Sequence, residues 1–303
     1  MGAGRRLLFV GYLLAIVGSM SYGLNPLFAL PLYDKGLTPL SVLFYRYAFA
    51  VVGMAAMMLI ERHPFRMTRR ETLLTLLMGV LFSLSSLFLF LSFHYMDAGI
   101  ASTILFTYPL LVVLISWLFL HERISRATLF GLLFATAGIL MLYRGSDGQT
   151  LSALGVLFVL LSSLVYALYL VGVNRSCLAV MPATKLTFYA MCTGVVMWFV
   201  SLRFGSDLQP LTTPSMWINA AGLAIFPTML SLVAITRSIH IIGSTQTSIF
   251  GALEPITALV VSVAVFHGTV TRRDGVGILL ILAAVTLVIA LKKKHHPTPV
   301  SKA

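Results

Sequence analysis

The chain has 303 residues, of which 59% are hydrophobic and only 10% are charged, and its mean hydropathy is +0.97. Soluble proteins average about 45 to 50% apolar and roughly 25% charged residues, so this composition excludes a soluble globular domain and predicts a polytopic membrane protein. The formal net charge is +12, but the basic residues are scattered among short loops. That distribution is typical of membrane topology and argues against nucleic acid as a partner.

Loop residues and charges divide the apolar sequence into ten predicted transmembrane helices, each near the roughly 20 residues that cross a bilayer. They cover residues 8–31, 39–60, 71–92, 98–120, 127–143, 152–173, 183–202, 215–236, 246–266 and 275–291. Helices fit these long runs better than the alternating strands of an outer-membrane barrel. The first run is interpreted as a membrane helix and not as a signal peptide, because it contains no small-residue cleavage site.

The basic residues indicate how the helices are oriented. With the N-terminus in the cytoplasm, the predicted cytoplasmic segments hold 15 Lys or Arg residues and the external loops hold 5. This bias predicts that both termini are cytoplasmic. The basic tail, residues 292–303, is expected to contact anionic lipid.

One segment of the chain occurs twice. At a constant offset of 146 residues, six positions recur: Ser102, Pro109, Ser116, His121, Arg126 and Gly131 correspond to Ser248, Pro255, Ser262, His267, Arg272 and Gly277. At an offset of 144, Tyr22 corresponds to Tyr166. The chain therefore divides into two five-helix repeats, residues 8–143 and 152–291. Because five is odd, the second repeat should be inverted in the membrane, as in secondary transporters that work by alternating access.

The segment from Pro109 through Leu120-His-Glu-Arg-Ile-Ser125 to Gly131 and Gly138 resembles the end of the repeat unit of the EamA family, in the drug/metabolite transporter superfamily. Leu253-Glu-Pro255 resembles the second repeat of the same family. The resemblance covers nearly the whole chain and implies solute export. It departs at His267-Gly268, where the family usually keeps a Gly-Glu pair.

Two charged residues lie inside predicted spans. An arginine at the centre of a span costs about 2.5 to 3.5 kcal/mol, so Arg46, which matches an arginine common in the family, should not face lipid. It either snorkels or binds a carbonyl, or it holds a substrate carboxylate or phosphate. Glu254 either contacts the solute or a proton, or hydrogen-bonds a neighbouring helix. A direct Arg46–Glu254 ion pair, which would make both residues structural, is a further alternative.

Polar residues at helical spacing predict the remaining lining of a substrate cavity. The candidates are Tyr22 and Asn25 on the first helix, Tyr166 and Tyr169 on its repeat counterpart, Ser83 and Ser86 on the third helix, and Tyr108. Packing is the alternative role for such faces. Three prolines, Pro109, Pro255 and Pro227, remove backbone hydrogen bonds and are predicted to act as hinges.

The sequence predicts no metal or cofactor. Cys177 and Cys192 lack zinc or haem spacing, and His121-Glu122 begins like a zinc-protease motif but has Ser125 where the second histidine belongs. No Walker motif is present, so an ion gradient or the solute's own gradient must supply the energy. Proton coupling is left open, as is the choice between monomer and homodimer.

These patterns favour a secondary transporter in the bacterial inner membrane that exports a small metabolite, such as an amino acid or a related amphipathic solute. The alternatives are a membrane-embedded enzyme and a channel or lipid-handling scaffold. The spans contain no Ser/Lys dyad, zinc-ligand set or paired aspartates, so the chain is not expected to be an enzyme.

Overall fold

The computed structural model describes residues 2–120, 126–143, 151–242, 247, 250–268 and 270–292. Within these residues the regular structure is entirely helical, which confirms the prediction of an all-α protein. The His121–Ser125 motif and the basic tail after Lys292 lie outside the described residues.

The helices follow the predicted spans along the chain. The first half contains α1 (Gly2–Gly23), α2 (Asn25–Asp34), α3 (Pro39–Ile60), α4 (Arg69–Ser92), α5 (Ala98–Leu105), α6 (Tyr108–Leu120) and α7 (Arg126–Tyr143). The second half contains α8 (Ala153–Asn174), the 3-10 helix η1 (Cys177–Val180), α9 (Ala183–Ser201), α10 (Pro214–Ala224), the π-helix η2 (Ile225–Leu230), α11 (Ser231–Ile242), α13 (Leu253–Phe266) and α14 (Arg272–Lys292).

Seven helical segments in the described residues are long and apolar enough to cross a membrane. They are Arg6–Asp34, Pro39–Ile60, Arg69–Ser92, Ala98–Phe119, Ala153–Asn174, Ala183–Ser201 and Pro214–Ile239. The chain is therefore a multi-pass membrane protein. The three other predicted spans coincide with α7, α13 and α14, and the total of ten spanning helices remains a prediction, as does the orientation of the termini.

Polar side chains fix where several helices begin. The hydroxyl of Thr68 accepts a hydrogen bond from the Glu71 backbone N–H, and the Glu71 carboxylate accepts one from Thr68 N–H at 2.7 Å, which forms a capping box at α4. Thr38 and Thr213 cap α3 and α10, each followed by a proline in the first turn. Such caps satisfy backbone donors that the first helical turn leaves free.

Two of the predicted proline kinks are helix interruptions. α5 ends at Leu105 and α6 begins at Tyr108, with Pro109 in its first turn. The chain turns at residues 251–252 before α13, which has Pro255 in its first turn. A proline is tolerated in the first helical turn because its missing N–H has no partner there. Both breaks fall inside the fourth and ninth predicted spans.

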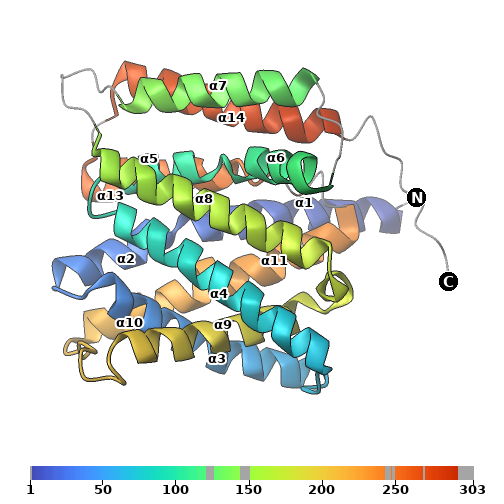
Figure 1. Cartoon of the computed structure of the whole chain (residues 1–303), viewed down its shortest axis with the longest axis vertical. Coiled ribbons are helices and arrows are strands. Elements are labelled where there is room, and N and C mark those ends of the chain that lie inside the picture. Colours follow the sequence, from blue (N-terminus) through green and yellow to red (C-terminus); the bar gives the residue numbers. More distant parts are fainter. Residues whose placement is uncertain are drawn as a thin grey trace.

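Helices from the two halves pack against one another in repeat-related pairs. Replacing each helix by its counterpart in the other repeat turns one observed contact into another observed contact. The α4–α8 contact corresponds to α1–α11, the α4–α9 contact to α3–α10, and the α6–α8 contact to α1–α13. α7 and α14 lie side by side at one end of the molecule, and α3, α9 and α10 lie at the other (Figure 1).

Candidate functional site

Arg46 is a buried cation in the middle of the helix bundle. Its side chain, carried by α3, is only 1% exposed. Its Nε donates a hydrogen bond to Thr228 Oγ1 at 2.9 Å, and its guanidinium carbon lies 5.4 Å from the centre of the Phe90 ring. The Nη2 atom has no hydrogen-bond partner among the described residues. The arginine therefore does not snorkel, and the two N–H donors of Nη2 are left without a partner.

The partner of Arg46 is created by a proline. Pro227 has no N–H to donate to the carbonyl of Leu223, four residues earlier, and the chain forms the π-helical segment η2 at this point. The Thr228 hydroxyl donates to that carbonyl instead, at 3.1 Å, and accepts the bond from Arg46. The predicted hinge at Pro227 thus supplies the acceptor that orients the guanidinium.

Glu254 is the second charge in the cluster and lies in the first turn of α13. A carboxylate is favoured there because the helix dipole is positive at its N-terminus. The side chain is half-buried, and it forms no ion pair with Arg46 and no hydrogen bond with any residue that the structure describes. The predicted alternative of a direct Arg46–Glu254 ion pair is therefore absent from this structure.

Tyrosines surround the two charges. Tyr22 lies close enough to interact electrostatically with both Arg46 and Glu254. Tyr108 and Tyr166 both lie within electrostatic range of Glu254 and Tyr22. The rings of Tyr108 and Tyr166 meet edge-on, with centroids 4.8 Å apart. These five residues, Arg46, Glu254, Tyr22, Tyr108 and Tyr166, are called the central cluster below.

The central cluster draws on both halves of the chain. It takes residues from α1, α3 and α6 in the first half and from α8 and α13 in the second. Tyr169 extends it, because its ring stacks on that of Tyr166 at 5.9 Å. The sequence prediction therefore selected residues that the fold does bring together.

The other candidates have local partners. Asn25 donates from Nδ2 to the Tyr22 carbonyl at 2.8 Å, across the break between α1 and α2, so part of its role is to cap this interruption. Ser86 is buried and accepts a hydrogen bond from the Tyr47 hydroxyl at 2.8 Å. Ser83 is fully buried and its hydroxyl has no partner among the described residues. Ser86 is linked to Arg46 through Tyr47, which interacts with the arginine electrostatically.

Two aromatic neighbours of Arg46 were not predicted from the sequence. Tyr47 is fully buried, and Tyr33, on α2, interacts electrostatically with Arg46 and donates its hydroxyl to the Phe90 carbonyl at 3.2 Å. Tyrosines are frequent in membrane helices, so composition alone does not distinguish them. Only its position directly after Arg46 could have identified Tyr47 as a candidate.

Hydrogen bonds join the two halves away from the cluster. The Ser262 hydroxyl on α13 donates a hydrogen bond to the carboxylate of Asp97. The same carboxylate also accepts hydrogen bonds from the backbone N–H groups of Gly99 and Ile100 at the start of α5. Gln209, in the loop before α10, donates to the Gly36 carbonyl at 2.7 Å. These bonds fix the relative position of the interrupted helices that carry the cluster.

The residues that the structure describes contain no group of three or more His, Cys, Asp or Glu side chains placed to hold a metal ion. What they do contain is a multi-helix membrane bundle in which Arg46 from one half and Glu254 from the other lie inside the protein without a direct ion pair. Ionisable residues inside a membrane bundle mark substrate or ion pathways.

The chain belongs to the EamA-like transporter family, which it matches over residues 9–144 and 153–290. It is therefore a membrane transporter, and the resemblance seen in the sequence motifs is confirmed.

Its relatives carry the same general description. It is 23% identical over 282 residues to the uncharacterized transporter YcbK of Bacillus subtilis, covering 90% of this chain and 88% of that protein. It is 27% identical over 214 residues to the uncharacterized transporter sll1319 of Synechocystis, covering 69% of this chain and just 64% of that protein. It also matches the uncharacterized inner membrane transporter YedA of Escherichia coli, at 25% identity over 67% of this chain and 65% of YedA.

A solved crystal structure has the same fold. It superposes with a TM-score of 0.66 at 17% identity, covering 96% of this chain and 98% of the other.

Proposed function

We propose that the protein is a secondary transporter that exports a small zwitterionic metabolite, an amino acid or a related solute, across the bacterial inner membrane. In this proposal the two five-helix repeats are inverted and rock against each other around the central cluster. The repeat-related helix contacts support this arrangement, and the membership of the family supports transport as such.

The unpaired state of Arg46 and Glu254 is the observation that carries the proposal. Tyr22 lies within electrostatic range of both charges, yet Arg46 and Glu254 form no ion pair with each other in the structure. A buried donor without a partner destabilises the folded state by about 1 to 3 kcal/mol. The partnerless Nη2 of Arg46 therefore lowers the stability of the fold. An α-amino acid offers a carboxylate for the guanidinium and an ammonium group for Glu254, which would satisfy both ends at once.

Counterflow in proteoliposomes tests this function. Vesicles preloaded with an unlabelled neutral amino acid should accumulate the same labelled amino acid faster than empty vesicles, because a carrier exchanges solute across the membrane. We expect Arg46→Gln and Glu254→Gln to abolish counterflow. The control is Arg237→Gln, which removes an exposed arginine that pairs with Glu61 at 3.6 Å. Equal counterflow in all three variants would show that the central cluster does not bind the solute.

The same assay separates solute contact from proton coupling. If Glu254 carries the coupling proton, Glu254→Gln should retain counterflow while losing uptake driven by a pH gradient. If it binds the ammonium group of the solute, both activities should be lost.

A further inference from the structure

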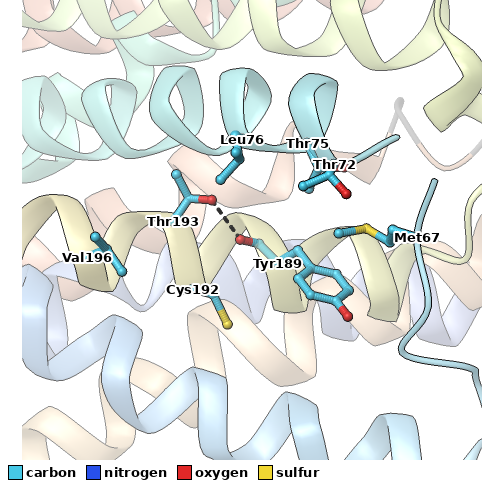
Figure 2. A pocket seen from close by; sticks show the side chains of 8 residues that line it. All are labelled: Met67, Thr72, Thr75, Leu76, Tyr189, Cys192, Thr193 and Val196. Carbon is cyan, nitrogen blue, oxygen red and sulfur yellow. Dashed lines mark hydrogen bonds between the residues drawn. The ribbon is translucent and has the colours of Figure 1, made fainter. Parts of the chain in front are cut away.

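A pocket lies between α4 and α9. Figure 2 shows its lining side chains, and its volume is about 280 Å³. The residues that line it are Met67, Thr72, Thr75, Leu76, Tyr189, Cys192, Thr193 and Val196. Both helices are among the segments long enough to span the membrane, so the medium beside this pocket is lipid.

The pocket is separate from the central cluster. At its inner side, Gly79 of α4 lies directly against the Thr193 side chain, and Gly194 of α9 lies against the Tyr47 ring. On the outer side, Leu76 is 47% exposed and Val196 is 64% exposed. The pocket therefore opens sideways, toward the membrane, and its back wall consists of tightly packed residues.

A basic rim borders one end of the pocket. Arg66, Arg69 and Arg70 are exposed at the point where the loop after α3 enters α4. Nearby, Lys185 donates from Nζ to the Arg66 carbonyl at 2.6 Å, which places a fourth cation beside the loop. The N-terminus of α4 adds the positive end of a helix dipole, which the Glu71 carboxylate of the capping box partly offsets. Four cations against this one carboxylate leave this end of the pocket positive, which suits an anion.

A free hydroxyl lies below the rim. Thr72 and Thr193 donate to the carbonyls of Thr68 and Tyr189, at 3.0 and 2.9 Å, but Thr75 Oγ1 is buried and has no partner among the described residues. Thr75 is six residues after Arg69, or about 9 Å of helix rise. Headgroup layers are roughly 5 to 8 Å thick on each side of the hydrocarbon core, so this hydroxyl lies near the depth of a lipid ester.

We propose that this pocket binds one anionic phospholipid. The phosphate contacts the arginines of the rim, and an ester oxygen accepts a hydrogen bond from the Thr75 hydroxyl. One acyl chain fills the apolar space between Leu76 and Val196. The lipid is a bound component of the protein and not its cargo. Because the pocket is walled off from the central cluster, this proposal and the proposed transport function can fail independently.

Lipid binding to the detergent-purified protein, measured by native mass spectrometry, tests the proposal. We expect one phosphatidylglycerol to be retained in preference to phosphatidylcholine. Arg69→Gln or Arg70→Gln should each weaken phosphatidylglycerol binding about fivefold, because a basic residue near an anionic surface contributes about 1 kcal/mol. Arg203→Gln, at an exposed position after α9, should leave binding unchanged.

Filling the pocket gives the decisive comparison. Cys192→Trp should abolish the retained lipid, whereas Leu140→Trp, at an exposed site on α7, should not. Thr75→Val keeps the shape of the side chain and should weaken binding without unfolding the protein. Retention of the same lipid by Cys192→Trp, or equal affinity for the two lipids, would overturn the proposal.

Cys192 itself provides an independent measurement. In a Cys177→Ser protein it is the sole thiol, since the chain has two cysteines. Its reaction with a maleimide should be slower in vesicles containing phosphatidylglycerol than in vesicles of phosphatidylcholine alone. Protection by inorganic phosphate in phosphatidylcholine vesicles would assign the rim to the free anion and reject the lipid.

Discussion

The Nε atom of Arg46 donates to Thr228 Oγ1 at 2.9 Å and thereby joins α3 of the first half to the π-helical segment of the second. The same hydroxyl donates to the carbonyl that Pro227 leaves free. The orientation of the buried cation therefore depends on a backbone irregularity in the opposite half of the chain.

Replacing the acceptor should separate orientation from charge. We expect Thr228→Val to lower the transport rate and to destabilise the protein by about 0.6 kcal/mol, the average for hydrogen bonds between membrane helices, and by no more than about 1.7 kcal/mol, the largest such value. Thr228→Ser retains the hydroxyl and should restore transport. The measurements are counterflow and the fraction of monodisperse protein after heating. Normal transport by Thr228→Val would show that the guanidinium does not need this bond.

Restoring the backbone donor should have the opposite effect on stability. Pro227→Ala returns an N–H that can reach the Leu223 carbonyl, which favours a regular α-helix and displaces the Thr228 hydroxyl. We expect a higher melting temperature together with slower transport, as found where function depends on a strained element. Circular dichroism and counterflow on the same preparation would check this pair of changes. A variant that is more stable and equally active would argue against a role for the irregular helix.

Close helix packing beside Glu254 predicts a sharp steric effect. A Cβ added to Gly23 would collide with the Glu254 carbonyl oxygen, which is backbone and cannot swing aside. Gly23→Ala should therefore push α1 and α13 apart, with a loss of transport and of thermal stability. The matched control is Gly275→Ala, where nothing lies within 4 Å of the added carbon. Comparable melting temperatures for the two variants would contradict the observed packing.

The Asp97–Ser262 contact predicts coupling between the halves. Asp97→Ala removes both the cap of α5 and the bond to Ser262, whereas Ser262→Ala removes the second bond alone. Because replacing an N-cap residue by alanine costs about 0.5 to 2 kcal/mol, Asp97→Ala should be the more destabilising change. A double-mutant cycle measured by thermal unfolding should show non-additive effects. Additive effects would mean that the two side chains act separately.

The sequence contained the signals for the helices and for much of the central cluster. Arg46 and Glu254 stood out because charges are costly in apolar spans, and the repeat drew attention to Tyr22, Tyr108 and Tyr166. The bond from Arg46 to Thr228 was not predictable, since it depends on a π-helical segment and on contact between residues far apart in the chain. The prolines were predicted to act as hinges inside continuous spans, but Pro109 and Pro255 follow interruptions, because each lies in the first turn of a new helix.

α7 and α14 pack against each other at the end of the molecule opposite α3, α9 and α10 (Figure 1). Every residue of the central cluster lies on other helices. Ala135 of α7 and Ala284 and Val285 of α14 nevertheless belong to the apolar cluster that packs against Tyr108. We therefore expect related proteins that share a solute to agree around Arg46, Glu254 and these three residues and to diverge along the exposed faces of α7 and α14, which are the natural place to attach reporters or fusion partners.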